Sequence, residues 1–264
     1  MARGSTCAPV RPEAPPDGAD RPRPGPDYGR AMGVERLLLF DIDGTLLRAG
    51  TVGGDVFDRA IEKVLGGPPA QRVSMSGKTD PQIVREYLAL MQEDDPAHLP
   101  AILAQLQSEL GAARAELAAV GTPCPGAHDL LGALAKDDRL HLSVLTGNIA
   151  PNAEVKLSVF GLEEHLDLET GAYGSDSEDR TALVPVAVQR LATLRGSRLH
   201  PQQVWVIGDT PRDLACAQAG GAHCLLVATG RFSRADLADL GAEAVLDDLS
   251  QTDEVVELLT AGLG

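Results

Sequence analysis

Two aspartates, Asp41 and Asp43, stand where an apolar run meets a glycine turn. The run is LLLF at 37–40, which is typical of a buried strand, and the turn is GT at 44–45. Residues two apart in an extended chain point to the same side, so these carboxylates would repel each other. Such a pair persists with a cation or a shared proton, and a glycine turn offers backbone N–H groups to an anion. The DxDGT pattern therefore predicts a divalent metal beside a phosphate. The simpler alternative is a solvated Asp-Gly turn that closes an ordinary strand.

A second acidic motif follows another apolar run. The segment VWVIGDTPRD at 204–213 places Asp209 at the tip of a buried strand and Asp213 near the start of a helix. Magnesium prefers hard oxygen ligands in near-octahedral geometry, so Asp209 beside Asp41 would suit it, and Asp213 would orient a metal-bound water. In the alternative interpretation, Asp209 caps the helix that begins at Pro211, and Asp213 sits in its first turn against the helix dipole.

A third motif, Thr146-Gly147-Asn148, follows the apolar run at 142–145. A hydroxyl and successive backbone N–H groups can donate to phosphate oxygens, and the helix that begins near residue 152 would add its dipole if its N-terminus pointed inward. Taken alone, Thr-Gly-Asn is also a common turn between a strand and a helix. The presence of the two aspartate motifs elsewhere in the chain favours phosphate binding by this loop.

Together the three motifs resemble the signature of the haloacid dehalogenase-like (HAD) hydrolase superfamily, particularly phosphoglycolate-phosphatase-like members with a helical cap. Their order and spacing match over residues 34–264. The resemblance implies that Asp41 is the nucleophile and Asp43 the general acid and base. It further implies that Asp41, the backbone carbonyl of Asp43 and Asp209 bind Mg²⁺ with support from Asp213, and that Thr146 binds phosphate.

The chain departs from this family where a lysine usually precedes the helix that leads to the last motif. Asp179-Arg180-Thr181 stands there, and we expect Arg180 to replace the lysine, since its planar guanidinium suits phosphate or carboxylate. The alternative is a solvated arginine beside acidic neighbours. In the segment SGKTD at 76–80, Lys78 could reach the substrate's leaving group, or it could be a solvated residue before a helix cap.

Apolar runs, caps and breakers predict an alternation of strands and helices. Strands are expected at 37–40, 140–145, 204–207, 223–227 and 244–246, with a short one around 169–173; helices are expected at 127–136, 152–160, 182–194, 211–219 and 253–259, and, after the first strand, at 55–65, 81–91 and 99–120. This order predicts an α/β fold, a doubly wound, Rossmann-like parallel sheet with right-handed crossovers. The core would comprise 34–48 and 122–264, and 49–121 would be an inserted helical cap over the site.

Composition narrows the class of protein further. Aromatic residues make up only 3% of the 264, so Leu, Val, Ile and Ala must build the core. A net charge of −15 opposes binding to nucleic acid or anionic membranes. The four cysteines and six histidines show no metal-ligand spacing, which favours reduced thiols in a cytoplasm, and no apolar stretch approaches the roughly 20 residues of a membrane helix.

Residues 1–33 carry seven of the 18 prolines and show neither helical nor strand periodicity. This composition predicts a disordered tail without the apolar region of a signal peptide. Because Met32 directly precedes the first strand, we hypothesise that translation starts there.

These observations predict a Mg²⁺-dependent phosphatase that hydrolyses a small phosphate monoester, with phosphoglycolate as the best guess, through an aspartyl-phosphate. A dehalogenase with the same nucleophile is disfavoured, because it needs neither Asp43 nor Asp209. A sugar-phosphate mutase stays open, since it shares the aspartyl-phosphate, and so does a non-catalytic binding protein on the same scaffold. The expected partner is a small phosphorylated metabolite, and a monomer or weak homo-oligomer is expected.

Overall fold

The computed structural model describes Met1 and residues 33–263. Residues 33–263 lie within one compact unit. The tail predicted for 1–33 therefore lies outside the described residues, apart from its two ends. Within the described part of the chain, no helix is both long enough and apolar enough to span a bilayer.

Five parallel strands form the central sheet, in the order β4-β1-β5-β6-β7. Their bounds are β1 Arg36–Phe40, β4 Leu140–Val144, β5 Val204–Gly208, β6 His223–Val227 and β7 Ala244–Leu246. Strand β1 pairs with both β4 and β5, and Phe40 lies level with Val144 and Ile207. Because parallel strands end at the same edge, this register brings the three sequence motifs to one edge of the sheet.

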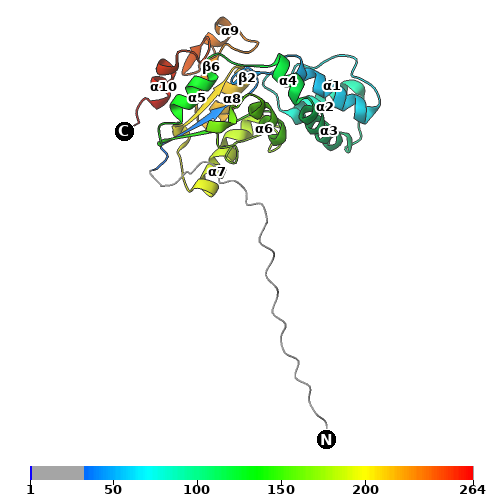
Figure 1. The fold of residues 1–264 in the computed structure, drawn as a ribbon, viewed down its shortest axis with the longest axis horizontal. Coiled ribbons are helices and arrows are strands. Elements are labelled where there is room, and N and C mark those ends of the chain that lie inside the picture. The colour runs from blue at the N-terminus through cyan, green and yellow to red at the C-terminus, as the bar shows by residue number, and fades with distance from the viewer. Residues whose placement is uncertain (2–32, 264) are drawn as a thin grey trace. The chain divides into compact units, whose positions relative to one another are not determined.

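Helices cover both faces of the sheet. Leu38 and Phe40 of β1 belong to one apolar cluster, whereas Leu37 and Leu39 belong to another, as side-chain alternation along a strand requires. The first cluster includes α5 (Ala127–Leu134), α6 (Ala150–Val159) and α10 (Thr252–Thr260); the second includes α7 (Leu183–Arg195), α8 (Pro211–Gly220) and α9 (Arg234–Ala238). The predicted doubly wound α/β fold is confirmed (Figure 1).

Four helices follow β1 and gather at one side of the sheet (Figure 1). They are α1 (Val52–Leu65), α2 (Asp80–Met91), α3 (His98–Ala112) and α4 (Arg114–Val120). All four contain fully buried residues, among them Ile61, Tyr87, Ile102 and Leu117. A short antiparallel pair of β2 (Leu47–Arg48) and β3 (Thr122–Pro123) joins the two ends of this helical segment, residues 49–121. Its treatment as a separate cap domain stays a prediction.

The structure differs from the predicted elements in several places, and the two-residue strands β2 and β3 were not predicted. The single helix expected at 99–120 breaks at Ala113, where ψ is 10°, and both resulting helices pack on α6. The strand expected around 169–173 is a turn with one bridge between Leu145 and Ala172, because Thr170 bonds back to Asp167 and curls the chain. Helix α9 was not predicted, since it is only five residues long. Elsewhere the bounds differ by at most three residues.

Candidate active site

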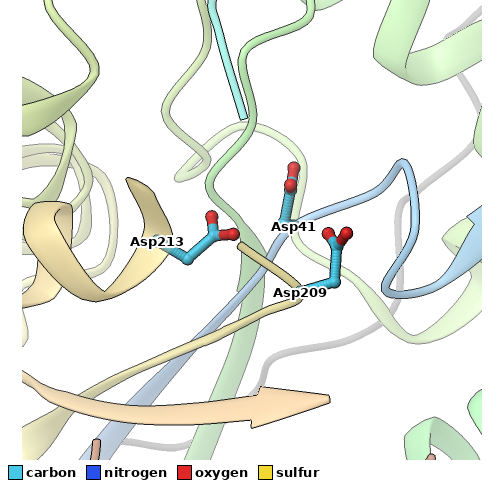
Figure 2. A group of neighbouring side chains, drawn as sticks. All are labelled: Asp41, Asp209 and Asp213. Carbon is cyan, nitrogen blue, oxygen red and sulfur yellow. The ribbon is translucent and has the colours of Figure 1, made fainter. Parts of the chain in front are cut away.

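Three buried aspartates converge at the carboxyl ends of β1 and β5. Asp41, Asp209 and Asp213 each place a carboxylate oxygen within 4.8 Å of the other two. Figure 2 shows the carboxylate of Asp209 beside that of Asp41, with Asp213 approaching from the start of α8. Sequence motifs 168 residues apart at their first aspartates thus meet at one point, although the role of each residue stays a prediction.

The local electrostatics show why this cluster could hold a cation. Burial raises the pKa of Asp41, and the Arg180 guanidinium opposes that rise. Burial also raises the pKa of Asp209, and the neighbouring charges of Asp213 and Asp41 raise it further. Three buried carboxylates this close together are costly to ionise, so the cluster could hold a cation, and its all-oxygen donor set fits Mg²⁺.

Arg180 lies between two of these carboxylates rather than in solvent. Its side chain is 5% exposed, and Nη2 is 3.0 Å from Asp41 Oδ2 and also donates to Asp213 Oδ1. Burial alone would lower its pKa, but Asp213 and Asp41 outweigh that effect and raise it. Its Nε has no partner among the described residues. The structure therefore contradicts the alternative of a solvated arginine.

Asp213 is engaged by the protein on both oxygens. Its Oδ2 accepts bonds from the backbone N–H and the hydroxyl of Thr210, at 2.9 and 2.7 Å, in a capping box at the start of α8. Its Oδ1 accepts from Arg180. The alternative of a first-turn residue thus describes Asp213 in part, but Thr210 and not Asp209 is the N-cap. These contacts favour a supporting role for Asp213 beside Asp41 and Asp209.

Asp43 does not belong to this cluster, and its partners lie on α6 and in the loop after β4. Its Oδ2 accepts from Asn148 Nδ2 at 2.8 Å and from Lys156 Nζ at 2.6 Å. Sequence reasoning missed Lys156. The signal was present, because Lys156 lies on the same face of its helix as buried Ala153 and Leu157, where a charged residue needs a partner.

The loop Thr146-Gly147-Asn148 lies against the start of α2. Asp80 N donates to Gly147 O at 2.7 Å, and a Cβ on Gly147 would come within 2.0 Å of Lys78 O, so only glycine fits. The Thr146 hydroxyl accepts from Asn148 Nδ2 at 2.8 Å, which leaves its proton available to an anion.

A cavity of about 260 Å³ opens between the sheet edge and the helical segment. Its walls contain every predicted site residue except Asp209 and Asp213: Asp41, Asp43, Lys78, Thr146, Gly147, Asn148 and Arg180. Lys156 also lines it. The Lys78 ammonium pairs with Glu86, so the structure places Lys78 in the wall with its charge already partly balanced.

Comparison with protein-family models identifies the family to which these motifs belong. The model of the haloacid dehalogenase-like hydrolases matches residues 38–218, more than half of the chain. The chain belongs to this family. Its membership confirms the resemblance drawn from the three motifs, since all three lie within the matched range.

Among relatives of this haloacid dehalogenase-like protein, a phosphoglycolate phosphatase of Rhodospirillum rubrum is 28% identical over 221 residues, covering 82% of this chain and 89% of the relative. The tyrosine-protein kinase PtkA of Mycobacterium tuberculosis is also 28% identical, over 227 residues, covering 85% and 72%. The crystal structure of CbbY from Rhodobacter sphaeroides in complex with phosphate is similar in fold, with a TM-score of 0.61, 21% identity, and coverage of 83% and 96%.

Proposed function

We propose that this protein is a Mg²⁺-dependent phosphatase that hydrolyses a small phosphate monoester through an aspartyl-phosphate on Asp41. The observation that carries the proposal is the arrangement around Asp41. This carboxylate is buried, contacts Arg180, lies beside Asp209, and faces a cavity that Asp43 also lines. Membership of a hydrolase family and similarity to a phosphoglycolate phosphatase support the same reaction class.

In the proposed first step, an Asp41 oxygen attacks phosphorus as the bond to the leaving oxygen breaks. Asp43 donates its proton to that oxygen, so the alcohol leaves neutral. In the second step, Asp43 takes a proton from water, the water oxygen attacks phosphorus, and the bond to Asp41 breaks to release phosphate. Arg180 and the Thr146 hydroxyl stabilise charge on the phosphoryl oxygens, since preorganised donors act strongly in a buried site.

The donors fit a single Mg²⁺. We propose that Asp41, Asp209 and the backbone carbonyl of Asp43 would hold it, with Asp213 in support. When bound, the ion would offset the repulsion between the Asp41 carboxylate and an anionic phosphoryl group. Asp213 keeps Arg180 and the start of α8 in place for this site, through its bonds to Arg180 and Thr210.

We propose that the helical segment 49–121 acts as a cap, because its residues Lys78 and Asp80 line the cavity. A cavity of about 260 Å³ suits a small metabolite, and phosphoglycolate is the first substrate to test. Because Lys78 already pairs with Glu86, its charge does not indicate whether the substrate's leaving group is charged or neutral. We keep a cytoplasmic location and a monomer or weak homo-oligomer as predictions.

Transfer to an acceptor other than water is the competing proposal. A sugar-phosphate mutase would use the same aspartyl-phosphate, and one relative is named a tyrosine-protein kinase. A non-catalytic binding protein would be expected to lack one of the acidic residues, whereas Asp41, Asp43, Asp209 and Asp213 are all present.

The test measures phosphate release from a panel of phosphomonoesters with Mg²⁺ and with a chelator. We expect release only with Mg²⁺ and its abolition in Asp41→Asn. Asp239→Asn changes an exposed aspartate outside the site and should match the unmodified protein. Isomerised sugar phosphate without free phosphate would indicate a mutase, and binding without turnover a non-catalytic protein.

A further inference from the structure

Lys156 is a charged residue buried in the middle of a helix. It lies on α6, and its side chain is 9% exposed. Removing an ammonium group from water costs several kcal/mol unless partners compensate, so a buried lysine indicates a specific need for its charge. Its buried neighbours on α6 supply no such partner, since Ala153 and Leu157 are apolar and Asn152 Oδ1 bonds to no residue that the structure describes. The compensation must come from the adjoining loops.

The partners are two residues of the predicted site. Lys156 Nζ donates to Asp43 Oδ2 at 2.6 Å and to Asn148 Oδ1 at 2.7 Å. Asn148 Nδ2 in turn donates to the same Asp43 Oδ2 at 2.8 Å. Each of the three side chains therefore contacts the other two. This triangle joins the loop after β1, the loop after β4, and helix α6.

The triangle distinguishes the two oxygens of Asp43. Two donors, one of them a cation, converge on Oδ2, which makes it a poor place for a proton. Oδ1 has no hydrogen-bond partner among the residues that the structure describes. The Asp43 side chain is 40% exposed and lines the cavity, so Oδ1 can meet the substrate.

We infer that Lys156 is a positioning residue that, with Asn148, anchors Oδ2 of Asp43 so that Oδ1 holds and transfers the proton. This inference rests on the proposed phosphatase reaction and adds to it a residue that the motifs do not contain. It also separates the roles of Arg180 and Lys156, two buried cations that line the cavity. Arg180 contacts the nucleophile Asp41, whereas Lys156 contacts the acid Asp43.

A purely structural ion pair between α6 and the loop after β1 would show the same contacts, so the test must separate the two roles. General acid catalysis matters for an alkyl phosphate, whose alkoxide leaves poorly, and matters little for p-nitrophenyl phosphate, whose phenolate leaves without a proton. The ratio of kcat/KM for the two substrates isolates the step in which the leaving group departs. Asp43's later role as a base does not enter this ratio.

The variant is Lys156→Met, assayed with Mg²⁺ on phosphoglycolate and on p-nitrophenyl phosphate. We expect kcat/KM to fall by about 10- to 100-fold on phosphoglycolate and by no more than about threefold on p-nitrophenyl phosphate. Asp43→Asn should show the same selectivity, and Lys156→Arg should recover part of the loss. Lys63→Met removes another lysine that pairs with a buried acid, Glu109, but lies outside the cavity walls, and should leave both rates unchanged.

The double variant Asp43→Asn with Lys156→Met guards against misfolding, since it removes the carboxylate that pairs with Lys156, while Asp80 keeps its bond from Ile149 N. If Lys156 acts through Asp43, the double variant should be as active on phosphoglycolate as Asp43→Asn alone. Equal losses of Lys156→Met on both substrates, no loss on either, or additive losses in the double variant would overturn the inference while the phosphatase proposal stood. Absence of Mg²⁺-dependent hydrolysis in the unmodified protein would end both.

Discussion

Arg180 replaces the lysine expected in this family, and its contacts show what the replacement requires. A guanidinium can donate to Asp41 and Asp213 at once from one planar group, whereas an ammonium has compact geometry at the end of a flexible chain. Both carboxylates are buried, so each depends on this cation for much of its stabilisation. We propose that this side chain has two roles, holding the two carboxylates in place and stabilising the phosphoryl group.

We predict that Arg180→Ala lowers kcat/KM by at least about 100-fold and destabilises the fold by about 3–5 kcal/mol, because it leaves buried carboxylates unpaired. Arg180→Lys should lie between Arg180→Ala and the unmodified protein in both kcat/KM and stability. Steady-state kinetics and denaturant unfolding measure the changes. Arg195→Lys, which also alters a pair with a buried aspartate, Asp167, should change stability but not kcat/KM. Near-normal turnover of Arg180→Ala would refute a role in catalysis.

The acidic cluster predicts a linkage between protons and Mg²⁺. Burial and the charges of Asp213 and Asp41 raise the pKa of Asp209 to about 9, and burial raises the pKa of Asp41 to about 6. Metal-free protein thus holds a proton on Asp209 at pH 7, and Mg²⁺ must displace it. We expect Mg²⁺ affinity to rise with pH between about 6 and 9, with about one proton released at pH 7.

Whereas Mg²⁺ affinity should rise with pH, the stability of the metal-free protein should fall with pH. An acid whose pKa is higher in the folded state binds more protons there, so the free energy of unfolding should fall as pH rises from about 4 toward 9. Titration calorimetry in buffers of different ionisation enthalpy measures the released proton, and thermal unfolding measures the slope. Asp209→Asn should abolish the proton release at pH 7 and flatten the slope above pH 7, while Asp41 and Asp80 keep a slope at lower pH. Mg²⁺ binding without proton release at pH 7 would contradict the prediction.

At the scale of elements, helix α2 begins against the loop after β4. Thr79 is its N-cap, and Asp80 at its first position is 5% exposed. Asp80 Oδ2 accepts from Ile149 N at 2.8 Å, while its own N–H donates to Gly147 O. Burial raises the pKa of Asp80 to about 7, and the charge of Lys156 opposes that rise. One residue of the helical segment therefore holds the predicted phosphate-binding loop at two points.

We predict that Asp80→Ala lowers kcat/KM about tenfold and stability by about 1–3 kcal/mol, because Ile149 N would lose its buried acceptor. Asp80→Asn keeps an oxygen in place and should cost less. Asp95→Ala removes an aspartate that accepts one backbone N–H near the start of α3, but this residue is exposed. It should affect stability only slightly and leave kcat/KM unchanged. Equal kinetics of Asp80→Ala and Asp95→Ala would contradict the proposed link between α2 and the site.

Elements marked by strong periodicity and by motifs were predictable from the sequence. Buried runs such as 37–40 and 204–207 have no other reasonable interpretation, and parallel strands must bring their carboxyl ends together, so the approach of Asp209 to Asp41 followed. Lys156 was not found, because its partners come from two other segments and its own helix shows only one charge on an apolar face. The break at Ala113 depends on packing against α6, which local sequence does not encode.

At the scale of the whole molecule, a chain with net charge −15 must bind an anionic substrate. Positive charge is available locally, since Arg180, Lys156 and Lys78 all line the cavity. Each of these cations already contacts a carboxylate, so the cavity is balanced rather than strongly positive. The largest demand for added positive charge lies at Asp41 and Asp209, where the divalent ion is proposed to bind.

The helical segment contacts the rest of the molecule where α3 and α4 pack on α6 and, beside the cavity, where α2 begins. Asp80 bonds to Gly147 and Ile149, and the Thr79 hydroxyl donates to Glu178 O at 2.8 Å. The chain enters and leaves the segment through the short β2–β3 pair. Because a substrate must enter and phosphate must leave, we expect these bonds to open and close as a unit while the sheet stays intact.

Amide hydrogen exchange followed by NMR tests this motion. We predict that the amides of Asp80 and Ile149, which cross between the segment and the loop, exchange faster than that of Leu39 in the central strand β1. Mg²⁺ with inorganic phosphate should slow the first two and leave Leu39 unchanged, because a ligand that contacts both sides favours the closed arrangement. Asp41→Asn should weaken this protection. If all three amides exchanged equally slowly without ligand, the segment would be fixed in place, and entry of the substrate would need another route.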